Sequence, residues 1–131
     1  MQATLNQIVT FQGVGLHSGA PVLLQIHPAR PGHGIVFRRT DLSPAVDIPA
    51  LWDRVTPSKL CTLLDNGHGV TLSTVEHVMA ALAGTGIHNA LVTVDGPEVP
   101  ILDGSSAPFV EAILDAGIRR QAAALRAIRV L

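Results

Sequence analysis

Two residues with complementary chemistry, Glu76 and His77, stand side by side at the start of a predicted helix. Ser73 is a residue type that caps helices, and apolar residues recur at helical spacing after it. In a structural interpretation, Glu76 completes a capping box that Ser73 opens three residues earlier. In a chemical interpretation, His77 binds a metal ion and Glu76 takes a proton from metal-activated water. Capping boxes are common, so the pair by itself favours the structural interpretation.

A catalytic metal site needs more donors than this helix supplies. Zinc in such a site takes three protein ligands and keeps one position open. None of the six histidines has a His or Asp four residues further on, and no HExxH motif is present. By spacing alone, the sequence offers one plausible ligand and one plausible base. The histidines are His17, His27, His33, His68, His77 and His88.

Three other motifs have ordinary structural interpretations. The stretch GVGLHSG at 13–19 lacks the Lys-Ser/Thr ending of a phosphate-binding loop, so we expect a tight turn that displays His17. Asp103 precedes a predicted helix start, where Asp and Ser act as caps. Cys61 lies in an apolar stretch, and we expect a small buried residue of a strand there instead of a nucleophile.

Most of the first half of the chain is typical of strands. The hairpin signal Asn-Gly at 66–67 separates two of them. A buried strand is expected later, at 89–95. The ranges rich in β-branched and apolar residues are 4–12, 21–29, 35–41, 45–50, 59–65 and 70–73.

Two helices are predicted in the second half. The first carries an apolar stripe and ends at Gly84 or Gly86. The second begins after Ser105 or Ser106 and stops at Gly117. The tail is ambiguous, because 120–127 has helical propensity and 127–131 resembles the beginning of a strand. The expected buried positions are Val75, Val78, Met79 and Leu82 in the first helix, and Phe109, Val110, Ile113 and Leu114 in the second.

This order of elements predicts an α+β fold. We expect a two-layer sandwich in which two main helices pack on one face of a mixed or antiparallel sheet. The length of 131 residues suits one domain.

Composition excludes several classes of partner. Nine basic and ten acidic residues give no excess of positive charge for nucleic acid, and few aromatic residues are available for an RNA-binding sheet. No apolar run approaches the ~18 residues of a membrane span. Cys61 is the only cysteine and the N-terminus has no signal-peptide pattern. We therefore expect a soluble cytoplasmic domain.

Several blocks occur together in a specific order. They are GVGLHSG, GIVFRRTDL, VDIPA, LCTLL and STVEHVMAALAGTGIHNALVTVDGPEVPILDGSSAPFVEAILDAGI. In order and spacing these blocks resemble the N-terminal half of the UDP-3-O-acyl-N-acetylglucosamine deacetylase family, zinc-dependent hydrolases of lipid A biosynthesis. The resemblance extends over nearly the whole chain.

The resemblance implies two similar α+β domains with the active site between them. His77 matches the one zinc ligand of the first domain, and Glu76 matches the general base beside it. Leu60, Cys61 and Thr62 match a strand that lines the substrate cleft. The resemblance also assigns a turn near the acyl-chain passage, which Leu16 and His17 match.

The family's remaining site residues belong to the second domain. They include two more zinc ligands, a His and an Asp one helical turn apart, and this sequence has no such pair. His88 stands where many relatives carry an acidic residue, and we do not expect it to be a ligand. We expect residues 1–120 to be the N-terminal domain, and 121–131 a linker or the start of a missing second domain.

The implied reaction is hydrolysis of the N-acetyl group of UDP-3-O-acyl-N-acetylglucosamine. Zinc would be bound by the parent enzyme, and weakly or not at all by this chain, because one ligand does not hold it tightly. The isolated chain is therefore expected to be inactive. The alternative is a non-catalytic structural or interaction module that docks with a separate second domain.

Overall fold

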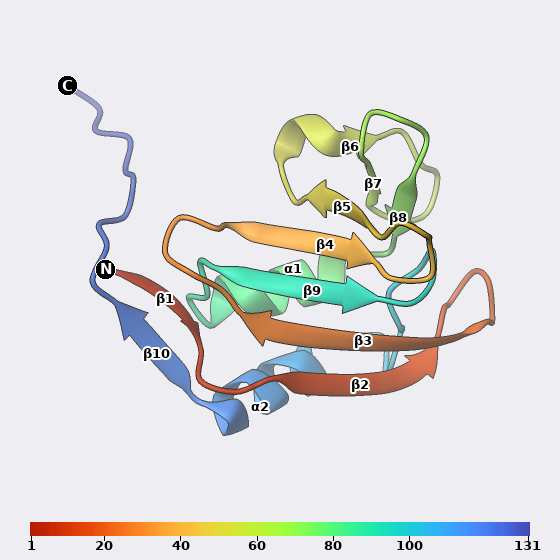
Figure 1. Ribbon diagram of the computed structural model, residues 1–131, viewed down its shortest axis with the longest axis horizontal. Coiled ribbons are helices and arrows are strands. Elements are labelled where there is room, and N and C mark those ends of the chain that lie inside the picture. Colours follow the sequence, from red (N-terminus) through yellow and green to blue (C-terminus); the bar gives the residue numbers. More distant parts are fainter.

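A five-stranded sheet with the strand order β2-β3-β9-β4-β5 forms one layer of the protein, and two α-helices form the other (Figure 1). The computed structural model describes residues 1–131. The strands are β1 (Gln2–Leu5), β2 (Val9–Val14), β3 (Pro21–Pro28), β4 (Ile35–Arg39), β5 (Val46–Pro49), β6 (Val55–Thr56), β7 (Leu63–Asp65), β8 (Thr71–Ser73), β9 (Ala90–Val94) and β10 (Ile118–Gln121). The helices are the 3₁₀ turn η1 (Trp52–Arg54), α1 (Glu76–Gly84) and α2 (Ala107–Ala116).

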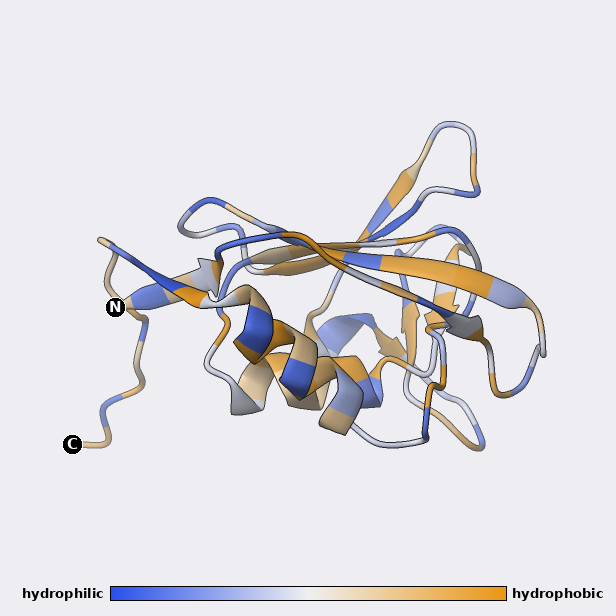
Figure 2. Ribbon diagram, turned by 90° about the horizontal axis from the view of Figure 1, so that it is seen from below, coloured by the Kyte–Doolittle hydropathy of each residue, from blue (hydrophilic) through white to orange (hydrophobic).

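The large sheet is mixed, which is one of the two arrangements expected from the sequence. Strands β4 and β9 run parallel, while β2–β3, β3–β9 and β4–β5 are antiparallel pairs. Alternate residues of its central strands are buried, so one face turns toward the helices. Both helices lie under that face (Figure 2). The α+β two-layer sandwich expected from the sequence is therefore confirmed.

The core lies between the sheet and the helices. Helix α1 buries Val78, Ala81 and Leu82, and α2 buries Phe109 and Ile113. The predicted stripes are confirmed at most positions, and Leu114 is the exception. Its side chain is 57% exposed.

Phe109 is expected to be a principal stabilising residue of α2. Its fully buried ring lies 4.8 Å from that of Phe11, measured between centroids. Phe109→Ala would leave a cavity under the sheet and lower the free energy of unfolding by about 3–5 kcal/mol. Urea denaturation measures this loss. Leu114→Ala, on the exposed side of the same helix, is expected to change it by only about 0.5 kcal/mol, and equal losses in the two variants would contradict this packing.

A second, three-stranded sheet with the order β6-β7-β8 sits beside β5. Arg39 fastens it to the large sheet, since its Nη1 donates to the Thr71 carbonyl at 2.7 Å while its Nη2 pairs with Asp41 at 2.6 Å. The hydrogen bond from Arg39 holds the pKa of Asp41 below its ordinary value, against the smaller opposing effect of burial. Asp41 therefore stays charged at neutral pH, and its ion pair with Arg39 is retained.

The strand expected at 59–65 forms only at its end. Residues 57–62 are a loop, and β7 covers Leu63–Asp65. The strand expected at 4–12 is two strands in different sheets, because the chain turns between β1 and β2. The hairpin at 66–69 is confirmed, with β7 and β8 antiparallel on either side. The shortened β7 leaves the 57–62 loop free to approach α1.

A two-stranded sheet of β1 and β10 closes the other end of the molecule. Buried Asn89 holds it, because its Nδ2 donates to the side-chain oxygens of Gln2 and Gln121, both at 2.8 Å. Gln2 also holds the chain just beyond β10, since its N–H donates to the Ala123 carbonyl at 2.9 Å and its Nε2 to the Ala124 carbonyl at 2.8 Å, and after Ala124 the chain leaves the body of the protein (Figure 1). Neither the helix suggested at 120–127 nor the strand suggested at 127–131 forms, and β10 occupies residues where no strand was predicted.

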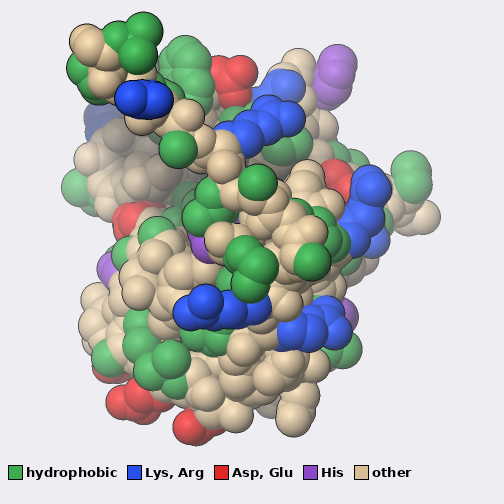
Figure 3. Space-filling view, turned by 90° about the vertical axis from the view of Figure 1, so that its left-hand side faces the viewer, with side chains coloured by type: hydrophobic (Ala, Val, Ile, Leu, Met, Phe, Trp, Pro, Cys, Tyr) green, Lys and Arg blue, Asp and Glu red, His purple; other side chains and the backbone are tan.

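The end that carries β1, β10 and the tail is basic. Figure 3 shows several basic side chains on this end. Residues 116–131 contain four arginines and no acidic residue. Helix α1 starts beside β8 and ends here, where the His88 N–H donates to the Ala3 carbonyl at 2.9 Å. The basic surface therefore lies near the C-terminal end of α1, and the first turn of α1 lies at the opposite end of the helix.

Candidate active site

Glu76 does not form a capping box. Helix α1 begins at Glu76 itself, its N-cap residue is Val75, and no side chain caps it. Ser73 belongs to β8, where its N–H donates to the Pro97 carbonyl and its carbonyl accepts from Val99. These strand bonds fix Ser73 too far back along the chain to cap α1, so the structural interpretation of the sequence was wrong on this point.

The Glu76 carboxylate is instead turned toward the 57–62 loop. Its Oε2 accepts a hydrogen bond from the Thr62 N–H at 3.1 Å. Glu76 also occupies the first turn of α1, where the helix dipole favours a negative charge. The side chain is half-buried, so water and a ligand can reach it. One backbone donor holds the carboxylate in place and leaves its other oxygen without a protein partner.

A sharp bend before the helix sets the direction of Glu76 and His77. Thr74 has a φ of +62°, which is unusual for a residue with a side chain. Its N–H donates to the Thr62 carbonyl at 3.0 Å, and its side chain is buried. A strained backbone of this kind persists only where the surroundings fix it, and such residues cluster at functional sites.

His77 follows Glu76 and is also half-buried. Its backbone carbonyl accepts a hydrogen bond from the Ser106 hydroxyl at 2.9 Å, which ties the start of α1 to the start of α2. Its imidazole hydrogen-bonds to no group of the chain. The imidazole is therefore free to take a metal ion, and histidine is the commonest metal ligand among side chains.

Asp103 lies near His77 and has a structural partner. The hydrogen bonds from the Ser105 hydroxyl and N–H lower the pKa of Asp103, and the positive charge that His77 can carry adds a smaller effect in the same direction. The carboxylate accepts both bonds through Oδ1, at 2.8 and 2.9 Å. These bonds form a turn before α2, whose N-cap residue Ser106 makes no side-chain capping bond, so Asp103 shapes the entry to the helix but does not cap it.

The 57–62 loop carries three residues that the resemblance assigns to the substrate cleft. Thr62 contacts Glu76 through its N–H, as described above. Leu60 is 80% exposed, and Cys61 is half-buried with its Sγ 3.3 Å from the Ser58 hydroxyl. The expectation that Cys61 is a buried residue of a strand was wrong, because the strand starts only at Leu63.

The turn at 13–19 carries Leu16 and His17, the other two residues that the resemblance assigns to the substrate cleft. The side chains of both residues are exposed, and the Gly19 N–H closes the turn on the Gly15 carbonyl at 2.9 Å. The turn is not held by its own residues alone. The backbone N–H groups of His17 and Ser18 both donate to the carboxylate of Glu98, at 2.9 Å each.

Glu98 was not predicted from the sequence. It is only 3% exposed and follows β9 in a connection that runs back to β8. Burial acts to raise the pKa of its carboxyl, but hydrogen bonds from His17, Ser18 and Thr74 outweigh this and hold the pKa below its ordinary value. The sequence offered one sign that Glu98 has a special role, which is that it is a lone acidic residue between two prolines in an apolar stretch, PEVP.

The chain offers one donor to a zinc ion at this place. No three His, Cys, Asp or Glu side chains gather closely enough to hold a metal. His77 and Glu76 suit a zinc site by their chemistry, but a site needs three protein ligands. This chain alone therefore supplies one of the three protein ligands that such a site requires. His88 is already used, since its Nδ1 accepts the Ala3 N–H at 3.0 Å.

An apolar groove of about 200 Å³ adjoins the site. It shares Thr62 with the 57–62 loop and reaches Met79 on the first turns of α1. Trp52, 88% exposed, forms part of its rim. The lining residues are Ala50, Leu51, Trp52, Val55, Thr62, Leu64, Val75 and Met79.

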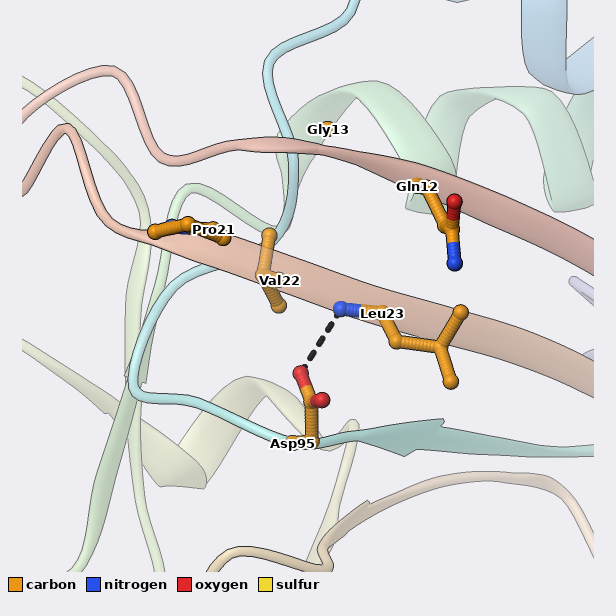
Figure 4. A pocket seen from close by; sticks show the side chains of 6 residues that line it. All are labelled: Gln12, Gly13, Pro21, Val22, Leu23 and Asp95. Carbon is orange, nitrogen blue, oxygen red and sulfur yellow. Dashed lines mark hydrogen bonds between the residues drawn. The ribbon is translucent and has the colours of Figure 1, made fainter.

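A larger hollow of about 320 Å³ lies on the β2–β3 hairpin (Figure 4). Its one titratable side chain, Asp95, accepts the Leu23 N–H at 2.7 Å. That bond joins the end of β9 to β3, and none of the lining residues belongs to the group around Glu76. The hollow therefore has a structural carboxylate and no partner for catalysis, and it is not the candidate site.

Comparison with known proteins places the sequence of this chain in a family. The family described as LpxC, UDP-3-O-acyl N-acetylglycosamine deacetylase, matches residues 2–131. The chain belongs to this family. Relatives named UDP-3-O-acyl-N-acetylglucosamine deacetylase are 54% identical in Haemophilus influenzae over 129 residues and 55% identical in Vibrio vulnificus over 129 residues. Another, from Myxococcus xanthus, is 59% identical over 122 residues.

These alignments cover most of this chain and less than half of each relative. They span 98% of the chain and 42% of the Haemophilus influenzae and Vibrio vulnificus proteins. For the Myxococcus xanthus protein the shares are 93% and 38%.

Among the helices of the fold, none has the length and apolar character that crossing a bilayer requires.

Proposed function

We propose that this chain provides one half of the active site of a zinc-dependent deacetylase. The substrate is UDP-3-O-acyl-N-acetylglucosamine, and the reaction removes its N-acetyl group in lipid A biosynthesis. The observation that carries the proposal is the placement of Glu76. Its carboxylate caps no helix, is held by the Thr62 N–H and stands next to the unpaired imidazole of His77. Family membership supplies the substrate class.

In this proposal Glu76 is the general base. It accepts a proton from the water that attacks the acetamide carbonyl, while the Thr62 N–H keeps the carboxylate directed. His77 supplies one ligand to zinc. Zinc, when bound in the whole protein, provides Lewis-acid activation of water and stabilises negative charge. Leu16, His17, Leu60 and Cys61 contact substrate from the two exposed loops.

The proposal needs a second half. The boundary expected at 120 falls inside β10, whose last residue Gln121 is buried, so we assign residues 1–121 to an N-terminal domain and the rest of the chain to a linker or to the start of a further domain. A C-terminal domain of the same enzyme supplies the other zinc ligands. The proposal is supported by the single metal donor of this chain and by its span of 42% of the Haemophilus influenzae and Vibrio vulnificus relatives. The single cysteine suits the reducing cytoplasm, which is where we place the reaction.

Reconstitution tests this function. The 131-residue chain is mixed with the second half of a relative, zinc is added, and release of the free amine from UDP-3-O-acyl-N-acetylglucosamine is followed by mass spectrometry. We expect no turnover from either half alone and measurable turnover from the mixture. Deacetylation by the chain alone with stoichiometric zinc would refute the two-half proposal.

An interaction module without catalytic residues is the second candidate. It is favoured by the apolar groove beside Thr62 and by exposed Trp52 and Leu60, which suit a surface covered by another domain. A module of this kind would restore activity to the second half even when Glu76 is replaced. The Glu76 variant considered in the Discussion therefore separates the two candidates.

A further inference from the structure

Glu98 is a buried carboxylate with three donors and no cation beside it. Oε1 accepts from the His17 N–H at 2.9 Å and from the Thr74 hydroxyl at 3.2 Å, and Oε2 accepts from the Ser18 N–H at 2.9 Å. A buried charge is costly unless its hydrogen-bonding capacity is met. Here two backbone N–H groups of the 13–19 turn and the hydroxyl of Thr74 satisfy that capacity. The side chain of Glu98 therefore holds two separate segments of the chain together.

The turn around Glu98 is shaped to admit it. Gly15 is buried against this carboxylate, and a Cβ at that position would overlap Glu98 Oε2 and the Ser18 hydroxyl oxygen. Glycine is therefore needed at position 15 for the close approach of the backbone. The GVGLHSG motif thus serves to receive the carboxylate of Glu98, in addition to forming a tight turn.

A continuous path of hydrogen bonds leads from this turn to Glu76. Glu98 holds the side chain of Thr74, and the backbone N–H of Thr74 donates to the Thr62 carbonyl at 3.0 Å. The N–H of Thr62 in turn donates to Glu76 Oε2 at 3.1 Å. Thr74 is also the residue whose positive φ sets the start of α1. Both ends of the path carry residues assigned to the active site.

We propose that Glu98 is a positioning residue that couples the Leu16–His17 turn to the catalytic carboxylate of Glu76. It touches no reacting group and acts through Thr74 and Thr62. The inference rests on the proposed function in one respect, namely that Glu76 and the turn serve the same substrate. The coupling itself is a property of this chain and requires neither zinc nor the second half.

Amide NMR spectra of the labelled 131-residue chain test the coupling from the Glu98 side. Glu98→Gln keeps the shape of the side chain but removes its charge and one acceptor. We expect the backbone amide signals of His17 and Ser18 to shift, and those of Thr62 and Glu76 to shift with them. Glu111→Gln, an exposed glutamate of α2, is the matched control and should leave all four signals in place.

Thr74→Val tests the same coupling from the other side and retains the buried charge, with two of its three donors. It removes only the hydroxyl that binds Glu98, and the expected result is a shift of the His17 and Ser18 amides, which Thr74→Ser restores. This variant also decides the question if Glu98→Gln does not fold. Unmoved His17 and Ser18 signals in Thr74→Val would overturn the proposal, as would a Glu98→Gln response confined to residues 15–18. A failed deacetylation assay would bear on the proposed function and not on this coupling.

Discussion

Glu76→Gln is expected to reduce deacetylation by the reconstituted enzyme by about 10²–10⁴-fold, the usual contribution of a general base. Glutamine has the same shape, and its side-chain oxygen still accepts the Thr62 N–H, so the start of α1 should keep its structure. What is lost is the ability to take a proton. Steady-state rates at saturating substrate and zinc measure the effect, and circular dichroism monitors the fold.

Glu111→Gln is the control for this loss, because Glu111 is exposed on α2 and has no role in the site. The control should keep full activity. If Glu76→Gln were as active as Glu111→Gln, Glu76 would not be the base, and the chain would act only as an interaction module.

His77→Ala is expected to lower the zinc affinity of the reconstituted enzyme by more than about 100-fold, since losing a residue that merely orients a ligand already costs 10–100-fold. The fold should persist, because Ser106 binds the backbone carbonyl of His77 and not its imidazole. Equilibrium dialysis against zinc, with metal content read by atomic spectroscopy, measures the change.

His68→Ala provides the comparison for this variant. His68 is exposed in the turn between β7 and β8, and its removal should leave zinc affinity unchanged. Unaltered zinc binding by His77→Ala would remove this chain from the metal site. The isolated chain is expected to bind zinc weakly with or without His77, because one imidazole is a single donor.

Local sequence patterns predicted the main layers of this fold because its core elements follow regular periods. Content of Val, Leu and Ile marked β3, a short apolar run marked β9, and the stripe of Val78 and Leu82 marked α1. Strand β10 escaped prediction because its residues, IRRQ, show no apolar alternation. It exists through pairing with β1 more than a hundred residues earlier, and through the amide of Asn89. Such a partner leaves no local signal.

The candidate site was predictable in its chemistry and less so in its construction. Glu76 and His77 could be singled out by residue type and position. The absence of a capping box could not be predicted, because it depends on Ser73 pairing with a segment 24 residues further on. The role of Glu98 depends on burial under the 13–19 turn, which only the folded chain reveals.

The most direct test of the account is to identify the histidine that binds zinc. The chain, labelled with ¹⁵N in its imidazoles, is mixed with the unlabelled second half and titrated with zinc while the six histidines are followed by NMR. We predict that the ring nitrogen signals of His77 undergo the large change of metal ligation and that the other five histidines do not ligate. Ligation by another histidine of this chain, or by none, would contradict it.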